Sequence, residues 1–438
     1  MKEYKSSKKL KKLLINIRCA IIFNKEKRHE LRNRLLHSLP PTAARFQLAS
    51  TKFNEKNGTY NYRIENFKGE PSGINSIGFF YDNIGLSHAG RYVTRTLRRQ
   101  NIPFITKNFQ RVDCKKTSSE FDSTMQNELK YAVNLFNFNS SNVIDYYKIF
   151  PEDLKDRFNI IYGYWEYDKF PKHMLISANY ANEIWCPSNF ILEILSKYYS
   201  IPCVKMPVAI EFNQNNLNPY NREYFGLPSS CFLYIFTFDV GSEIRSGRKN
   251  PLAVIKAFQK AFPIRSSNVG LVMKITQRPE FIGTPKHDNL IDEIKTLSKQ
   301  MNLFTISDTL DDNQMKGLIN CCDVYVSLHR CEGLGLGMME AMKLGKPVIA
   351  TNYSGNTEFM RNDNSCPVDY NLIPSGIEDY LWADPDINQA AYYMQKLFTN
   401  KGYYRAISDK ARKHIETWHN AKYCADAMKQ RLKLLGLF

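Results

Sequence analysis

The chain has 438 residues, more than one ordinary hydrophobic core uses, so we expect two domains of roughly 150 to 220 residues each. Hydrophobic residues make up 43% and aromatic residues 13% of the chain, which excludes a largely disordered protein. The formal net charge is +17, and residues 1–36 carry twelve Lys or Arg against three Glu. Such a basic end is suited to nucleic acid or to an anionic membrane surface.

The basic segment 1–36 also has an apolar stripe on one helical face. The stripe consists of Leu10, Leu13, Leu14, Ile17 and Ile21. It favours an anionic membrane surface as the partner, with no nucleic acid, although a solvated helix packed on its own protein is an equally good interpretation. The apolar run 13–23 is interrupted by Arg18 and is shorter than the roughly 20 residues that span a bilayer. No signal-peptide cleavage site follows it, so we expect a cytoplasmic protein, with the inner face of the membrane as its place if the segment binds lipid.

Residues 37–72 mix Pro, Gly, Asn and charge without periodicity, so we interpret 1–72 as a basic amphipathic segment and a linker. From Ile74 onwards, short apolar strands alternate with helical stretches, which predicts a parallel sheet. The expected strands lie at 74–82, 102–109, 133–139, 158–166, 183–188 and 203–210. A loop at 85–90 and helices near 91–101, 146–150, 174–181 and 189–199 separate them.

The Asn-rich stretch 211–230 breaks this alternation and marks the boundary between a first domain, 73–210, and a second, 211–415. The second series of expected strands lies at 231–239, 268–276, 303–308, 323–329 and 347–351. Its expected helices lie at 251–262, 288–301, 312–321 and 337–344. The helices beyond about residue 386 are long and amphipathic, and we expect the last one, about 416–438, to complete the first domain. The fold class is therefore α/β, with two Rossmann-like, doubly wound parallel sheets.

Residues 322–360 (CDVYVSLHRCEGLGLGMMEAMKLGKPVIATNYSGNTEFM) combine a strand ending at His329, a Gly-rich turn and a helix. The turn contains Gly333, Leu334, Gly335, Leu336 and Gly337. Backbone N–H groups at such a helix start bind anions. Glu332 opens the turn and Glu340 follows eight positions later; because a carboxylate suits a vicinal diol, one acid could bind a ribose and the other a transferred sugar. Each feature alone also occurs in doubly wound proteins without this chemistry.

The whole string closely resembles the donor-binding signature of glycosyltransferase family 4, the glycosyl transferases group 1. In that signature two Glu separated by seven residues flank a Gly-rich turn, followed by EAMxxGxPVIAT and a turn ending in Glu, here Glu358. The resemblance extends over roughly residues 75–420 and implies the GT-B fold, in which two Rossmann-like domains face a central cleft. It also implies a retaining enzyme that moves a sugar from a nucleoside diphosphate sugar to a hydroxyl of a glycan or lipid-linked glycan.

The stretch FTFDVGSEIRSGRKNPLAVIKAFQKAF resembles the family's strand-loop-helix whose basic side chains reach the donor diphosphate. Lys249 matches the lysine position best, Arg248 is adjacent, and Arg245 is nearest to a second basic position. The resemblance therefore implies Glu332, Lys249 and Arg248 as catalytic residues. The donor-binding residues that it implies are Glu340, Gly333, Leu334, Gly335, Leu336, His329, Gly85 and Ser87.

In the first domain, IGFFYDNIGLSHAGRYVTRTL resembles the family's first loop, which faces donor and acceptor, and it contains Gly85 and Ser87. The segment NIIYGYWEYDKFP with NEIWCPSNF resembles bacterial surface-polysaccharide transferases, including those for lipopolysaccharide. Glu166 and His88 are the acceptor-side candidates. Trp165 and Trp185 are better explained as core aromatic residues than as sugar platforms.

No cofactor or metal is expected. Asp384, Pro385 and Asp386 form a DxD sequence, which we interpret as a turn and helix N-cap, and no Cys/His cluster has zinc spacing. The ten cysteines lack CxxC pairs and predict reduced, buried thiols. Two alternatives remain open: a non-catalytic partner subunit that binds a nucleotide sugar, and another GT-B enzyme such as an epimerase.

Overall fold

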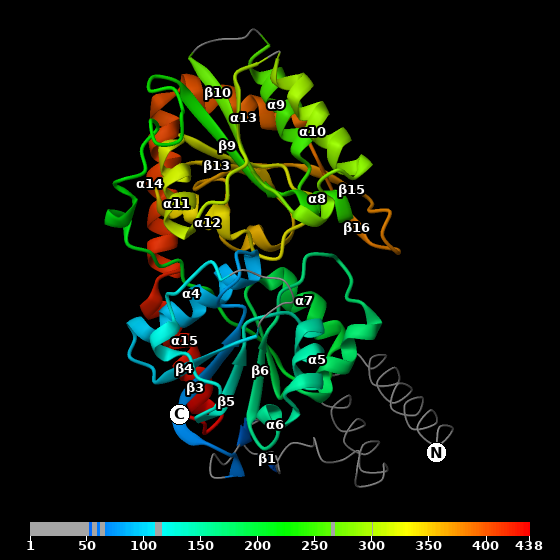
Figure 1. Cartoon of the computed structure of the whole chain (residues 1–438), viewed down its shortest axis with the longest axis vertical. Helices are drawn as coiled ribbons and strands as arrows, with labels where there is room; N and C mark the ends of the chain where they lie inside the picture. Colours follow the sequence, from blue (N-terminus) through cyan, green and yellow to red (C-terminus); the bar gives the residue numbers. More distant parts are fainter. Residues whose placement is uncertain (1–51, 55–58, 62–65, 110–115, 264–267, 300) are drawn as a thin grey trace. The chain divides into compact units, whose positions relative to one another are not determined.

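A computed structural model of the chain describes residues 52–54, 59–61, 66–109, 116–263, 268–299 and 301–438 (Figure 1). The predictions for the basic segment 1–36 fall outside these residues. The chain divides into two compact units. The first holds the described residues up to Trp165, Lys169–Ala209 and Ala421–Phe438, and the second holds Glu166–Asp168 and Ile210–Asn420.

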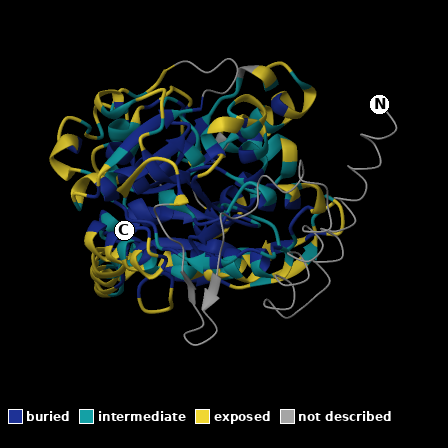
Figure 2. Ribbon diagram, turned by 90° about the horizontal axis from the view of Figure 1, so that it is seen from below, coloured by how far each residue is buried: buried dark blue, intermediate teal, exposed yellow. Residues whose placement is uncertain are grey.

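The first unit is built on one six-stranded sheet in the order β4-β3-β5-β6-β7-β8. Its strands are β3 (Glu70–Gly78), β4 (Phe104–Asn108), β5 (Tyr131–Phe136), β6 (Phe158–Tyr162), β7 (Glu183–Cys186) and β8 (Cys203–Lys205). All neighbouring strands are parallel, as the alternating pattern predicts. The strands are almost continuously buried, which is typical of a parallel sheet covered on both faces (Figure 2). A short antiparallel pair, β1 (Lys52–Asn54) and β2 (Thr59–Asn61), precedes the sheet in the chain.

The helices of the first unit depart from the sequence prediction in several places. They are α4 (Gly85–Arg99), α5 (Ser140–Ile149), α6 (Pro151–Leu154), α7 (Asn189–Tyr198) and α15 (Ala421–Leu434), with the short 3-10 helices η2 (Asp122–Thr124) and η3 (Lys172–Asn179). The loop expected at 85–90 is wrong, because α4 already begins at Gly85; within it, a Cβ at Gly90 would lie 3.0 Å from Cβ of Asn137. The α-helix expected at 174–181 is instead η3, the tighter form that proteins use in short connections.

Four buried asparagines bridge the strands of this sheet from side to side. The Nδ2 group of Asn75 on β3 donates to Oδ1 of Asn134 on β5 at 2.9 Å, and Nδ2 of Asn134 donates to Oδ1 of Asn159 on β6 at 2.8 Å. The backbone N–H of Asn159 donates to Oδ1 of Asn182, just before β7, at 2.8 Å. Because a buried amide without a partner is costly, this asparagine ladder favours one register of the four strands.

The second unit has a six-stranded parallel sheet in the order β11-β10-β9-β12-β13-β14. Its strands are β9 (Phe232–Asp239), β10 (Val269–Thr276), β11 (Leu303–Ile306), β12 (Val324–Ser327), β13 (Val348–Thr351) and β14 (Cys366–Val368). Its α-helices are α8 (Val240–Ser246), α9 (Pro251–Ala261), α10 (Pro285–Ser298), α11 (Asp312–Cys321), α12 (Leu336–Lys343), α13 (Ile387–Thr399) and α14 (Lys401–Trp418), and its 3-10 helices are η4 (Gln214–Leu217), η5 (Pro279–Phe281) and η6 (Ser354–Glu358). The two doubly wound α/β units confirm the predicted fold class.

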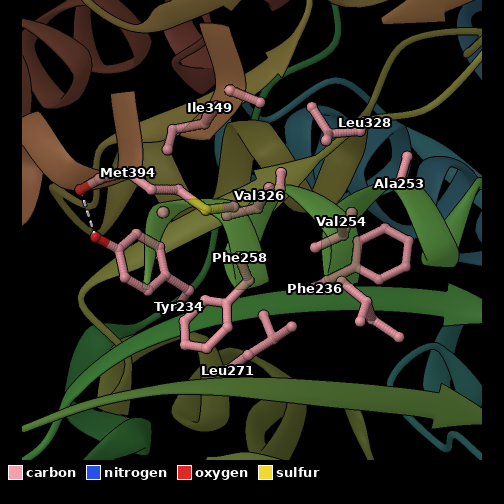
Figure 3. Packing of buried hydrophobic residues seen from close by; sticks show 14 of the residues in the cluster. Tyr234, Phe236, Ala253, Val254, Phe258, Leu271, Val326, Leu328, Ile349 and Met394 are labelled. Atoms are coloured by element: carbon pink, nitrogen blue, oxygen red, sulfur yellow. Dashed lines mark hydrogen bonds between the residues drawn. The ribbon is translucent and has the colours of Figure 1, made fainter. Parts of the chain in front are cut away.

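Apolar side chains from β9, β10, β12 and β13 pack against α9 and α13 to form the core of the second unit (Figure 3). Tyr234 is fully buried there among Phe258, Leu271 and Ile349, and its hydroxyl donates to the carbonyl of Met394 at 2.6 Å. This core provides a rigid base beneath the loops that leave the carboxyl ends of β9 and β12.

Some elements of the second unit were not expected from the sequence. These include α8, β14 and the antiparallel pair β15 (Tyr370–Pro374) and β16 (Leu381–Pro385). Asp384 lies in β16, so the turn expected around it is wrong. The expected N-cap is confirmed, because the side chain of Asp386 accepts from the N–H groups of Asn388 and Gln389 at the start of α13. Within the described part of the chain, no helix has the length and apolar character needed to cross a membrane.

Candidate functional site

The sheet of the second unit changes its direction of winding between β9 and β12. From β9 the chain adds β10 and β11 on one side, and from β12 it adds β13 and β14 on the other. Ligands of doubly wound sheets bind beyond the carboxyl ends of the strands at such a switch point. The segment after β9 leads to Arg248 and Lys249, and the segment after β12 leads to Glu332. The fold therefore brings together two regions that the sequence analysis singled out separately.

The Gly-rich turn after β12 depends on close backbone packing. Gly335 has the left-handed φ of 94° and directly precedes α12. A Cβ at Gly355 would lie 2.0 Å from the carbonyl oxygen of Gly333, so no side chain fits at that point. The backbone N–H of Glu332 donates to Oγ of Ser354 at 2.7 Å, and the N–H of Gly355 donates to the carbonyl of Glu332 at 2.8 Å. The turn 353–356 thereby fixes the backbone of Glu332.

The carboxylate of Glu332 contacts two cations at once. Its Oε1 accepts from Nζ of Lys249 and lies 3.2 Å from Nη1 of Arg248. Burial alone would raise the pKa of Glu332, but the charges of Lys249 and Arg248 outweigh burial and lower that pKa to about 2. Glu332, Lys249 and Arg248 thus form a largely buried ion cluster in which one carboxylate contacts two cations. Two cations held this close together suit a further anion that competes with the carboxylate for them.

Arg248 has a second carboxylate in reach. Its Nη2 lies 3.6 Å from Oε1 of Glu166, which is grouped with the second unit. Burial opposes the charged guanidinium, yet the coulombic effects of Glu332 and Glu166 raise the pKa of Arg248. Arg245 does not join this cluster, since it is exposed and lies 3.5 Å from Glu280. Arg248 rather than Arg245 is therefore the second base beside Lys249.

His329 is fully buried below the turn, and both of its ring nitrogens have partners in the protein. Nε2 faces the carbonyl of Tyr353 at 3.3 Å and Oδ1 of Asn356 at 3.0 Å, while Nδ1 lies 3.0 Å from Oγ of Ser327. Two acceptors at Nε2 assign the proton to that nitrogen, and Nδ1 then accepts from Ser327. Burial lowers the pKa of His329, so the ring is neutral at pH 7. His329 therefore donates to the turn 353–356 and helps to fix its conformation.

Glu340 lies in the second turn of α12, and its side chain is almost fully buried. Its Oε1 lies 3.6 Å from Nζ of Lys316, a buried lysine that also pairs with Asp312 at 2.6 Å. Leu334 is buried in the turn and Leu336 opens α12. Lys316 was missed from the sequence because its helix gives no signal beyond an i, i+4 pair with Asp312.

Three candidate residues lie in the first unit, at the start of α4. Gly85 is exposed, and a Cβ there would meet no atom within 4 Å, whereas Ser87 is buried. The Nε2 atom of His88 lies 2.9 Å from Oδ1 of Asn83, and its Nδ1 lies 3.2 Å from Nη2 of Arg91. Because Arg91 can only donate, Nδ1 of His88 accepts and Nε2 carries the proton. This segment follows β3, which lies beside β5 at the switch point of the first sheet.

The remaining sequence predictions concern metal binding, two tryptophans and the cysteines. In the described residues, no three His, Cys, Asp or Glu side chains gather as a metal site. Trp165 and Trp185 are buried core residues, as expected. The described cysteines are Cys186, Cys203, Cys231, Cys321, Cys322, Cys331, Cys366 and Cys424; none of them forms a disulfide bond, and all but Cys321 are fully buried. The predicted buried thiols are confirmed for this set.

Two solved structures share this architecture. Anabaena HepE in complex with UDP and glucose aligns with a TM-score of 0.62 at 11% identity, over 83% of this chain and 99% of that chain. Sucrose-phosphate synthase from Thermosynechococcus elongatus aligns with a TM-score of 0.60 at 13% identity, again over 83% and 99%. At these identities the likeness shows the fold alone, which is the two-domain α/β fold of GT-B glycosyltransferases.

The family match is more local. Residues 245–414 match the model of the family described as glycosyl transferases group 1. The matched segment contains Arg248, Lys249, Glu332 and Glu340, all within the second unit. No curated protein sequence matches the chain significantly.

Proposed function

We propose that the protein is a retaining, metal-independent glycosyltransferase that moves a sugar from a nucleoside diphosphate sugar to a hydroxyl group. The observation that carries the proposal is the ion cluster at the carboxyl ends of β9 and β12, where Lys249 and Arg248 meet Glu332. The match of residues 245–414 to a glycosyltransferase family supports it. HepE, which has the same fold, was solved with UDP and glucose.

The chemistry of the transfer requires a cationic site. Breaking the bond between sugar and diphosphate leaves negative charge on the leaving phosphate and positive character at the anomeric carbon. In our proposal, Lys249, Arg248 and the first N–H groups of α12 stabilise the phosphate charge. A diphosphate at this place competes with Glu332 for the two cations, which releases the carboxylate toward the donor sugar. The acceptor hydroxyl then attacks the anomeric carbon from the face that the diphosphate leaves, and its proton passes to an oxygen of the leaving phosphate.

The remaining roles follow the same proposal. Glu340 binds the ribose diol, with Lys316 at 3.6 Å stabilising its charge. For the first unit we propose donor-binding roles for Gly85 and Ser87 and an acceptor-side role for His88, and for Glu166 likewise an acceptor-side role. The acceptor is a glycan or lipid-linked glycan of a surface polysaccharide such as lipopolysaccharide. We place the enzyme in the cytoplasm, with residues 1–36 binding the anionic inner face of the membrane.

A panel of UDP, GDP, ADP and dTDP sugars tests the proposal by thermal shift, followed by a transfer and donor-hydrolysis assay. A ligand at 100 times its dissociation constant adds about 2.7 kcal/mol to the unfolding free energy. We expect one nucleotide series to stabilise the protein and its sugar to be released as product. Stabilisation without any turnover would instead support a non-catalytic binding subunit, and stabilisation by none of the four would reject the proposal.

Two acid variants separate the roles within the site. Glu340→Ala should weaken free nucleoside diphosphate strongly, because the ribose is present in donor and product alike. Glu332→Ala should slow transfer while nucleoside diphosphate affinity is kept or raised, because the competing carboxylate is removed. If both variants bind the nucleoside diphosphate like the parent, the ribose assignment of Glu340 is wrong.

A further inference from the structure

Glu243 on α8 makes an unusual pair of backbone contacts with the segment that carries the two cations. Its Oε2 accepts from the N–H of Lys249 at 3.0 Å and from the N–H of Asn250 at 3.0 Å. One carboxylate oxygen therefore bonds two successive backbone groups of the turn. The side chain of Glu243 is half-buried, and burial raises its pKa while the two N–H bonds lower it.

The turn 247–250 has two residues in the left-handed region. Gly247 and Asn250 have φ of 69° and 56°, a conformation that Gly and Asn adopt more readily than other residues. Asn250 precedes α9, but its side chain makes no cap bond to that helix; its Nδ2 donates instead to the carbonyl of Leu328 at 3.0 Å. Glu243 thus supplies from another helix an acceptor that a capping residue would provide locally.

Glu243 is itself held firmly in place. The side chain of Asp239 caps α8 by accepting from the N–H of Ser242 at 2.9 Å, and it also accepts from Nε of Arg278 at 2.5 Å. The N–H of Gly247 donates to the carbonyl of Glu243 at 2.7 Å, which closes α8 directly before the turn. Both ends of helix α8 are therefore held by hydrogen bonds. The carboxylate of Glu243 links this helix to the backbone of Lys249.

We propose that Glu243 is a positioning residue for the anion site: its carboxylate oxygen fixes the backbone of Lys249 and Asn250, so that the Lys249 ammonium stays directed at the diphosphate. This inference rests on the proposed function and adds a residue that does not itself contact the donor. In this role the reach of the acceptor oxygen is essential, whereas its charge only strengthens the two bonds to the N–H groups.

Three variants separate reach from charge. Glu243→Asp keeps the charge but withdraws the oxygen by one methylene group, Glu243→Gln keeps an oxygen at the same reach without the charge, and Glu243→Ala removes both. The probes are the nucleoside diphosphate among UDP, GDP, ADP and dTDP that stabilises the parent most, and its monophosphate. We expect Asp and Ala to lower diphosphate affinity about tenfold relative to the monophosphate, as the loss of one or two hydrogen bonds would. Gln should lose less affinity than Asp or Ala, within about fivefold of the parent, because its amide oxygen still accepts from both N–H groups but more weakly than a carboxylate.

The matched control is Asp386→Ala, which removes another carboxylate that accepts from two successive N–H groups in the same unit. This control should lower the melting temperature but leave the ratio of diphosphate to monophosphate affinity unchanged. The reverse order, with Asp like the parent and Gln weakened, would overturn the positioning role in favour of an electrostatic one. Lys249→Ala keeps the two proposals apart: if it leaves diphosphate affinity unchanged, the proposed function fails, whereas a loss at Lys249→Ala with none at Glu243→Asp rejects only the role of Glu243.

Discussion

The first sheet buries neutral amides between its strands, whereas the second gathers charged side chains beyond the ends of its strands. In the first unit, Asn75, Asn134 and Asn159 bond one another inside the sheet. In the second, Lys249 and Glu332 pair where β9 and β12 end. Neutral amides that satisfy one another specify structure. A buried ion cluster is weak evidence for stability, because taking its charges out of water is costly, and groups with strongly shifted pKa values concentrate at functional sites.

The largest expected effect comes from removing one cation of the second unit. Lys249→Ala should lower the transfer rate about 10³-fold, the loss expected when a preorganised group that stabilises transition-state charge is removed. The unfolding free energy of the first unit should not change. Steady-state rates measured beside Lys256→Ala, an exposed lysine on α9, test this. Equal rates for the two variants would place the site elsewhere.

Acid should affect the charged cluster and not the amide ladder. The folded pKa of Glu332, about 2, lies below the unfolded value, so its stabilisation is complete above about pH 5 and is lost as the pH falls toward 2. The loss amounts to at most about 3 kcal/mol. Denaturant unfolding of the parent and of Glu332→Gln from pH 7 to pH 3 measures it. The difference between the two proteins should shrink below pH 5, and a difference that is constant over this range would contradict the assignment.

Breaking the asparagine ladder should lower the stability of the protein and leave nucleotide binding unchanged. Asn134→Ala leaves amide groups of Asn75 and Asn159 without their partner and should cost about 2 kcal/mol of unfolding free energy. Nucleotide binding to the second unit should stay within about twofold of the parent, because sites without shared partners act independently. Asn371→Ala, at an exposed strand position, is the control for the substitution itself. A large loss of nucleotide affinity in Asn134→Ala would mean that the ladder also supports the site.

The smallest expected effect is that of a chelator. Since basic side chains and helix N–H groups are proposed to meet the diphosphate charge, excess EDTA should leave the transfer rate unchanged. Rates with EDTA, and with EDTA followed by magnesium or manganese, provide the measurement. A loss that either metal restores would show that a divalent cation shares the role assigned to Lys249.

Local sequence patterns were sufficient for much of the fold, whereas Arg248 and Lys249 were singled out only through the family resemblance. Apolar runs of strand length predicted β9 and β10, and the Gly-rich turn before α12 is a local signal for anion binding. Pairing across the sheet has no such signal: Glu332 and Lys249 are 83 residues apart and meet only because β9 and β12 are neighbours. Helix α8 has seven residues, too few for a clear helical period. The sequence therefore did not predict the helix that carries Glu243 beside Lys249.

The asparagine ladder was equally hidden. Asparagine is depleted in strands and common in turns, so Asn134 and Asn159 carry no local sign of a place in the sheet. Their function as partners depends on the strand order and register, which no single strand contains. Arg245 illustrates the converse, since the family resemblance made it the nearest match to a second basic position, whereas its side chain lies 3.5 Å from Glu280.

The contact between Gly355 and Gly333 has a consequence for comparing distant relatives. With 11% to 13% identity to the solved structures of the same fold, most aligned letters agree no better than chance. A backbone that passes 2.0 Å from where a Cβ would stand admits a single residue type at position 355. Wherever a relative builds the same turn against the same loop, that glycine is a fixed point from which its sequence can be aligned with this one.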